Sequence, residues 1–150
     1  MDVGYQYPDY YFSVPEAERG ERCSATADWC IVDQGYYFIR ACLEIPVIDG
    51  PQSFIWGVWG SVSEKSFEAM INTEEGDGGA RVQPYFSWFN STLPGYLATN
   101  GLKAMLYTQP SGLRPLLVLE PTDHPLAVEQ RNGITMKRVQ EIIEPFLHNG

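Results

Sequence analysis

A run in which apolar side chains recur at every second position, residues 36–45, constrains the fold of this chain more than any other feature. The positions that share one face are Tyr37, Ile39, Ala41, Leu43 and Ile45. The opposite face includes Arg40, Cys42 and Glu44. A period of two is typical of a β-strand, whereas an amphipathic helix has a period of about 3.6. The run therefore predicts a strand with one buried face.

Turn residues divide the rest of the chain into further strand candidates. The turn at 33–35 contains Gly35 and predicts an antiparallel hairpin, and Pro110-Ser111-Gly112 predicts a second. The strands expected in this way cover residues 29–32, 36–45, 53–62, 85–89, 102–108 and 113–120. Residues 116–119 are apolar throughout, which predicts a central strand covered on both faces.

Helices are expected between and after these strands. Ser13 with Glu16 three residues later forms a capping-box pattern at the start of the first helix. The expected helices run from Ser13 to about Gly20 and over residues 64–72, 124–130 and 136–148. The last one carries an apolar stripe at helical spacing, made of Val139, Ile142, Ile143 and Phe146.

These elements predict a single α+β domain over residues 1–150. The expected architecture is a mainly antiparallel sheet of about five strands, with the C-terminal helix packed on one face. Residues 1–12 are rich in tyrosine without a helical period, so we expect an extended arm that packs its aromatic residues on the body of the domain. Residues 74–80, rich in glycine and acidic residues, are expected to form a flexible loop.

The charge balance limits the classes of partner that this chain is expected to bind. The chain has 10 Lys and Arg against 19 Asp and Glu, and residues 1–50 hold 9 of the acidic side chains and only 3 basic ones. Such a surface repels phosphate groups, so nucleic acid and membrane surfaces are not expected partners, whereas a basic protein is. No window reaches the roughly 18 apolar residues of a membrane span, and residues 1–6 lack a signal-peptide pattern. A cytoplasmic location is the resulting expectation.

The three cysteines, Cys23, Cys30 and Cys42, give no sign of a disulfide framework or a zinc site. Their number is odd and their spacings match none of the usual zinc patterns. We expect buried, reduced thiols, no bound metal and no other cofactor.

A polar cluster near the end of the last strand is the best candidate for catalysis. Asp123 could orient the imidazole of His124 for general-base work, with Glu120 or Glu129 as a second carboxylate. In the structural interpretation, which is favoured, Asp123 instead caps the helix that begins at Pro125. Arg40 could serve a ligand or form an ion pair with a neighbouring strand. An aromatic set could line a pocket or fill the core, the latter being favoured; its members are Trp56, Trp59, Tyr85, Phe86, Trp88 and Phe89.

Several short segments together carry a family resemblance. They are residues 8–12, 38–47, 56–59, 93–96, 113–115, 123–130 and 133–134. In this order, over about residues 8–147, they resemble a bacterial family known as domain of unknown function twenty-one ninety-nine. The resemblance implies a small bacterial cytoplasmic protein without an established activity. Many members begin with a C-x-x-C-G segment like a zinc knuckle, but no cysteine precedes Cys23 here, so a zinc role is not carried over.

The residues leave two functions from different classes open. In the first, the chain is a non-catalytic binding protein, such as an immunity-type inhibitor of a toxin, with an acidic face toward a basic protein. The residues expected to contact the partner are Tyr5, Asp9, Tyr10, Tyr11, Glu16, Glu18 and Glu21. In the second, the chain is a small enzyme or ligand-binding domain that uses Glu120, Asp123, His124 and Arg40 around an aromatic pocket.

Overall fold

Two long antiparallel strands, β4 (Tyr36–Ile45) and β5 (Phe54–Val62), form the centre of the fold. The structure is a computed structural model that describes residues 2–76, 84–110 and 112–148. The two strands pair along almost their whole length, from Tyr37 opposite Val62 to Ile45 opposite Phe54. The face of β4 that contains Leu43 is buried, as the alternation predicts, so this strand and its buried face are confirmed.

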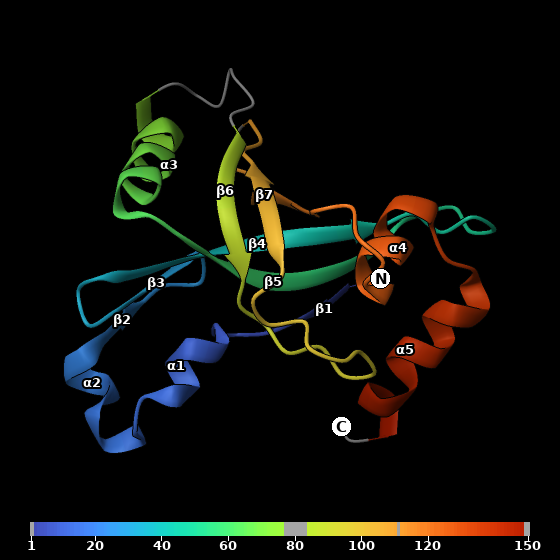
Figure 1. The fold of residues 1–150 in the computed structure, drawn as a ribbon, viewed down its shortest axis with the longest axis horizontal. Helices are drawn as coiled ribbons and strands as arrows, with labels where there is room; N and C mark the ends of the chain where they lie inside the picture. Colours follow the sequence, from blue (N-terminus) through green and yellow to red (C-terminus); the bar gives the residue numbers. More distant parts are fainter. Residues whose placement is uncertain (1, 77–83, 111, 149–150) are drawn as a thin grey trace.

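The sheet closes on itself. Strand β6 (Pro84–Phe89) pairs with β5, β7 (Lys103–Tyr107) with β6, and β8 (Leu116–Leu119) with β7, all antiparallel. Strand β8 then returns to β4 through one parallel pair, Cys42 with Leu116. The α+β class is therefore confirmed, but the expected simple antiparallel sheet is wrong, because five strands form a closed, barrel-like sheet (Figure 1).

Three short strands extend this sheet. Strand β1 (Asp2–Gly4) pairs in parallel with β5, while β2 (Cys23–Ala25) and β3 (Trp29–Val32) continue outward from β4. The prediction of an extended arm over residues 1–12 is thus wrong beyond its first residues. After β1 the chain turns into helix α1 (Asp9–Ser13), and Tyr10 and Tyr11 of this helix pack against buried residues of the sheet such as Phe38.

The first helix expected from the sequence is divided differently in the structure. Ser13 ends α1, and its Oγ donates a hydrogen bond to the carbonyl oxygen of Tyr10. A short 3-10 helix, η1 (Glu16–Glu18), and α2 (Arg19–Arg22) follow. The capping-box prediction is therefore wrong, because a residue before proline is held extended, and Val14 precedes Pro15.

The remaining helices are α3 (Glu64–Gly76), α4 (Pro125–Asn132) and α5 (Met136–His148). Helix α3 runs further than expected, so residues 74–76 of the predicted loop are helical and residues 77–80 lie outside the described residues. Helix α5 has the predicted bounds, and Val139 and Ile142 from its apolar stripe reach the core. Within the described ranges, no helix is long and apolar enough to cross a membrane.

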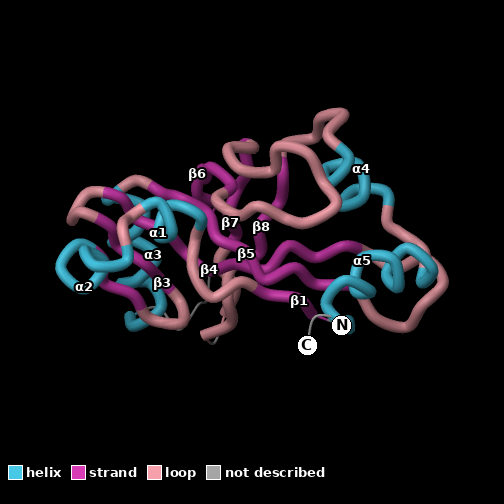
Figure 2. The backbone as a smooth tube through the Cα atoms, turned by 90° about the horizontal axis from the view of Figure 1, so that it is seen from below, coloured by secondary structure: helices cyan, strands magenta, loops and turns pink. Residues whose placement is uncertain are grey.

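Side chains pack into two cores on opposite faces of the β4–β5 pair. The larger core fills the closed sheet around residues such as Leu43, Trp56 and Leu117. The smaller one lies under α1 and α2, where Phe38 and Trp59 are buried. The N-terminal helices and the α4–α5 pair lie at opposite ends of the molecule (Figures 1 and 2).

Strand β8 is covered on one face only, because Val118 is 43% exposed, so the expected double coverage is wrong.

Candidate functional site

A cleft opens where β4 and β8 separate. The two strands share the pair Cys42–Leu116, where the Cys42 N–H donates to the carbonyl oxygen of Pro115 at 2.9 Å. In a continued parallel ladder the backbone of Glu44 would next bond the carbonyl of Leu117 and the N–H of Leu119. The strands part before that point, so those backbone groups of β8 need another partner.

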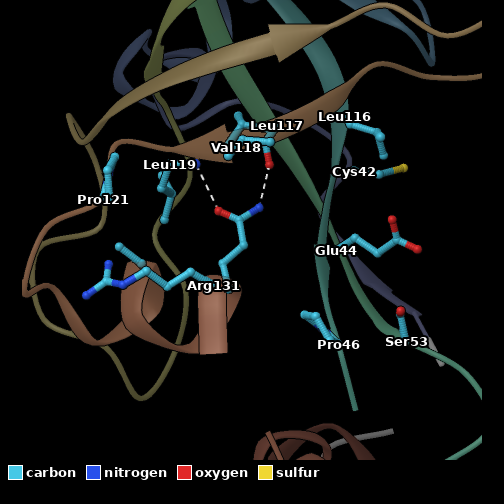
Figure 3. A pocket seen from close by; sticks show the side chains of 12 residues that line it. Cys42, Glu44, Pro46, Ser53, Leu116, Leu117, Val118, Leu119, Pro121 and Arg131 are labelled. Carbon is cyan, nitrogen blue, oxygen red and sulfur yellow. Dashed lines mark hydrogen bonds between the residues drawn. The ribbon is translucent and has the colours of Figure 1, made fainter. Parts of the chain in front are cut away.

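The side chain of Gln130, on α4, supplies that partner. Its Nε2 donates to the carbonyl oxygen of Leu117 at 2.8 Å, and its Oε1 accepts the N–H of Leu119 at 2.8 Å. The carboxamide thus occupies the place that a peptide group of β4 would have taken in the sheet (Figure 3). The backbone groups of Leu117 and Leu119 at the edge of β8 thus have hydrogen-bond partners without β4, and the cleft between the two strands stays open.

The cleft has a volume of about 480 Å³ and a mainly apolar lining. Cys42, Glu44 and Pro46 follow β4 along one wall, and residues of β8 and α4 form the other (Figure 3). The full lining comprises Cys42, Glu44, Pro46, Ser53, Leu116, Leu117, Val118, Leu119, Pro121, Ala127, Gln130 and Arg131. Clefts of this size and polarity are typical ligand sites.

Two opposite charges stand beside the cleft, those of Glu44 and Arg131. The Arg131 Nη1 donates to the carbonyl oxygen of Thr122 at 2.8 Å. The carboxylate of Glu44 is exposed and has no ion pair among the described residues. Burial raises the pKa of the Cys42 thiol, so this cysteine is not an activated nucleophile.

The Asp123–His124 corner serves the fold. His124, and not Asp123 as the structural interpretation expected, is the N-cap of α4: its Nδ1 accepts the N–H of Leu126 at 3.1 Å. The Nε2 of the same ring lies 2.6 Å from the carbonyl oxygen of Leu97. Both ring nitrogens are therefore engaged with backbone, while Asp123 and Glu120 are exposed.

Arg40 lies elsewhere, against β1 and β5. Its Nη1 donates to the carbonyl oxygen of Tyr5 at 3.2 Å, and the guanidinium lies over Gly57, where a Cβ would come within 1.9 Å of Nη2. Burial, with a smaller effect from Arg114, lowers the pKa of Arg40. Because Cys42 is paired with Leu116 in a parallel register, Arg40 is level with position 114 of the neighbouring chain segment. Glu120 lies six residues beyond that position, which corresponds to a distance of about 20 Å along the strand.

The structure thus does not bring together the four residues of the enzyme hypothesis. The aromatic pocket of that hypothesis is also divided, because Trp56, Trp59 and Phe89 are fully buried whereas Phe86 and Trp88 are 47% and 45% exposed. Strand alternation separates them, since neighbouring residues point to opposite faces. No group of three or more His, Cys, Asp or Glu side chains suited to a metal occurs within the described ranges.

The cysteines remain free thiols, but their burial differs from the expectation. Cys30 is fully buried, which raises the pKa of its thiol to about 12. Cys23 and Cys42 are only partly buried. The expected set of buried thiols is therefore wrong for two of the three.

Except for Tyr5, the residues expected to bind a partner lie in what we call the N-terminal lobe, residues 7–36. Inside it, Tyr7 stacks on Tyr11 with ring centroids 3.9 Å apart, and Tyr10 stacks on Tyr36 at 4.8 Å. Just before the lobe, Tyr5 packs against the larger core. The lobe therefore combines packed tyrosines with an exposed rim, by which we mean Glu16, Glu18 and Glu21.

Some of the predicted contact residues also hold the lobe to the barrel. The Asp9 carboxylate accepts the hydroxyl of Thr92 at 2.6 Å and its N–H at 3.2 Å. Within the lobe, two large aromatic side chains remain at the surface, Phe12 at 58% and Tyr36 at 50% exposure. Glu16 and Glu21 follow Phe12 closely in the sequence, and both are exposed. In the described part of the chain neither of them forms an ion pair.

An ion pair between Arg22 and Asp33 lies within the N-terminal lobe, and its contribution to the stability of the protein should depend on pH. Arg22 donates to both carboxylate oxygens of Asp33, at 2.7 and 2.8 Å, which lowers the pKa of Asp33 below its ordinary value. A lowered folded-state pKa adds stability above the unfolded-state pKa of about 4, and this contribution is lost as pH falls through the lowered value. We expect Asp33→Asn to weaken the protein at pH 7 and to flatten the acid dependence of its unfolding free energy.

Urea unfolding of both proteins at pH 7 and at about pH 2 measures this difference. Asparagine tolerates the positive φ of 52° at Asp33, so the turn itself is kept. Asp123→Asn, an exposed carboxylate, serves as the control and should keep the acid dependence of the original chain. Parallel acid dependence in Asp33→Asn and the original chain would contradict the role of the pair.

Sequence reasoning missed the cleft, and it assigned Glu129 to a catalytic cluster whereas the structure places this carboxylate in a different polar network. The Tyr96 hydroxyl donates to the Glu129 carboxylate, which also accepts from Arg138 Nε at 2.7 Å. The guanidinium of Arg138 lies 5.6 Å from the centre of the Tyr96 ring. Burial, and next the hydrogen bond to Glu129, raise the pKa of Tyr96. This network ties the loop that holds Tyr96, α4 and α5 together, and no local pattern signals it.

Comparison with known proteins adds one assignment. No curated protein and no solved structure matches the chain. A family model described as uncharacterized protein conserved in bacteria (DUF2199) matches residues 1–134, which include the strands and α4 but not α5. Segments on which the resemblance depended supply Glu44, Pro46, Ala127 and Gln130 to the cleft. The chain therefore belongs to the DUF2199 family of bacterial proteins.

Proposed function

We propose that this protein acts in the bacterial cytoplasm by binding a basic protein through its N-terminal lobe, without catalysing a reaction. Immunity-type inhibition of a toxin domain is one role of this kind. The observation that carries the proposal is the exposure of Phe12 and Tyr36 on a lobe whose rim holds Glu16, Glu18 and Glu21. Aromatic side chains supply contact area, and carboxylates steer a positively charged partner.

The surface left for the partner is narrower than the predicted set. Tyr5, Asp9 and Tyr10 are partly buried and make contacts within the fold. Tyr11 is stacked on Tyr7, and the guanidinium of Arg19 lies 5.0 Å from its ring centre. The partner would therefore meet Phe12, Tyr36, Glu16 and Glu21, together with Glu18, which is exposed but paired with Arg22 at 3.1 Å.

The test measures association with the products of the genes that lie next to this one. We expect one of them to bind, and the triple variant Glu16→Gln, Glu18→Gln, Glu21→Gln to bind about tenfold more slowly with a nearly unchanged dissociation rate. Raising the salt concentration should slow association of the original chain and narrow this difference, because charges are screened beyond about 8 Å at physiological ionic strength.

A matched variant separates the position of the charges from their number. Glu64, Glu68 and Glu141 are exposed carboxylates on α3 and α5, and their replacement by glutamine should leave the association rate close to that of the original chain. Equal slowing by both triple variants would show that total charge, and not the N-terminal lobe, controls binding. Equal rates in all three proteins would contradict the proposal.

The enzyme hypothesis has its own test. His124→Asn keeps a side-chain acceptor at the N-cap of α4, so the fold should survive. We expect this variant to bind the partner as the original chain does. Loss of function in a correctly folded His124→Asn protein would favour the enzyme hypothesis instead.

A further inference from the structure

We propose that the outer face of strands β6, β7 and β8 is a self-association surface, through which two copies of this chain form a weak dimer. This face lies outside the N-terminal lobe and goes beyond the proposed function. Three properties carry the proposal. The face is apolar and exposed, it bears no net charge, and its like charges stay apart when two copies pack about a two-fold axis.

The strand register places nine outward-facing side chains in three rows across β6, β7 and β8. Phe86 lies opposite Met105, and Met105 lies opposite Val118, which makes the middle row. Residues between these positions along the strands, such as Leu106 and Leu117, point into the larger core. The three rows are Pro84, Tyr107 and Leu116, then Phe86, Met105 and Val118, then Trp88, Lys103 and Glu120.

This face is apolar and exposed to solvent. All its members except the lysine and the glutamate are apolar or aromatic, and Phe86, Trp88 and Val118 are each more than two-fifths exposed. Elsewhere on the outer surface of the barrel, the N-terminal lobe covers β4 and β5, so that Phe38 and Trp59 are buried. Contiguous exposed patches larger than a few hundred Å² are rare on monomers and mark interaction sites.

The charge of this face points to a second copy of the same chain as its occupant. The whole chain has a net charge of -9, so two copies repel each other over most of their surfaces. The face itself holds one lysine and one glutamate, Lys103 and Glu120, which lie opposite each other in the register and cancel. The Lys103 ammonium also lies over the ring of Trp88, with Nζ 5.9 Å from the ring centre. Two copies therefore meet here without electrostatic repulsion between their contact surfaces.

A two-fold axis that crosses the three strands at the middle row makes the face self-complementary. Each residue of the middle row then lies against the same residue of the other copy, and the row with Lys103 lies against the row with Tyr107. The two Lys103 positions are separated by four residues along the strand, about 14 Å. Each ammonium instead meets the aromatic ring of Tyr107 in the other copy, which attracts a cation.

The size of the face sets the expected strength of the dimer. Its side chains offer on the order of 400 Å² per copy, about half of the roughly 800 Å² that each partner buries in a stable interface. The apolar surface continues into the cleft, because Leu116 and Val118 also line it. An area of this size predicts a reversible dimer with a dissociation constant on the order of 100 μM.

Sedimentation equilibrium of the full chain measures this association. Between about 5 and about 500 μM protein, we expect the average mass to rise from that of one 16.9 kDa chain toward that of two. Raising the NaCl concentration from about 50 to about 500 mM should strengthen the dimer about threefold or more, because salt screens the repulsion between two acidic chains. Salt has the opposite effect on the association proposed for the N-terminal lobe.

Phe86→Lys and Phe12→Lys form a matched pair, because each replaces an exposed phenylalanine and changes the net charge equally. Phe86→Lys places two ammonium groups face to face in the middle row and should raise the dissociation constant about tenfold or more. Phe12 belongs to the N-terminal lobe, so Phe12→Lys should stay within about twofold of the original chain. Val118→Lys, on another strand of the middle row, should repeat the loss, and circular dichroism checks that each variant folds.

A chain that stays monomeric at the highest protein and salt concentrations would overturn the proposal and leave the face to a different protein. Equal weakening by Phe12→Lys would place the contact elsewhere, and a dimer that survives both Phe86→Lys and Val118→Lys would do the same; either result overturns the proposal. The partner of the N-terminal lobe should still bind Phe86→Lys, so failure of this face and failure of the lobe are separate results.

Discussion

Replacing Trp56 with alanine will lower the free energy of unfolding by about 3–5 kcal/mol, the range for removing a large buried aromatic side chain. Trp56 is fully buried, and its ring centre lies 5.3 Å from that of Phe54, 6.4 Å from Tyr96 and 6.3 Å from Phe146. These rings come from β5, from the loop after β6 and from α5. The loss would be a large fraction of the roughly 5–15 kcal/mol that stabilises an ordinary domain.

Trp88→Ala is the matched control for this prediction. The same residue type stands on the outer face of β6 at 45% exposure, so its removal should cost less than about 1 kcal/mol. Urea unfolding followed by circular dichroism measures both variants. Similar losses in the two variants would contradict the assignment of Trp56 to the core and Trp88 to the surface.

Replacing Gln130 with glutamate will destabilise the protein by about 2 kcal/mol at pH 7 and much less near pH 4. The change puts a carboxylate oxygen where Nε2 donates to the carbonyl of Leu117, so one hydrogen bond is lost and two acceptors face each other. A protonated carboxyl can donate instead, which raises its folded-state pKa above the unfolded value of about 4.3. The neutral form therefore contributes stability at low pH, and this is lost as pH rises through the raised pKa.

The control for this change is Gln140→Glu, an exposed position on α5. Its unfolding free energy should stay within about 0.5 kcal/mol of the original at pH 7. Unfolding midpoints in urea at pH 4 and pH 7 compare the two variants. If Gln130→Glu behaves as Gln140→Glu does at both pH values, the carboxamide of Gln130 does not replace a rung of the sheet.

The cleft and the N-terminal lobe lie in different parts of the same sheet. Strand β4 connects them: Phe38 packs under the lobe, while Cys42 and Glu44 line the cleft. The N-terminal helices and the α4–α5 pair lie at opposite ends of the fold (Figure 1).

Local patterns were sufficient to predict most strands. The alternation over residues 36–45 and the turn at 33–35 identified β4 and its hairpin with β3, because side chains of a strand with one buried face must alternate. Helix α5 was predicted from its apolar stripe for a similar reason. Patterns of this kind failed near Ser13, where packing of the aromatic residues and the restriction before Pro15 prevent a continuous helix.

The sequence by itself determined the strands from β3 to β8, most of the helices and the acidic front half, since each depends on residues close together in the chain. Only the tertiary structure decided the closure of the sheet and the cleft, because both depend on the contact between Cys42 and Leu116. The role of Gln130 was equally hidden: a glutamine on an amphipathic helix carries no local sign that its carboxamide will complete the edge of a strand. That role arises only where α4 packs beside the point at which β4 and β8 part, and backbone groups there must find a partner.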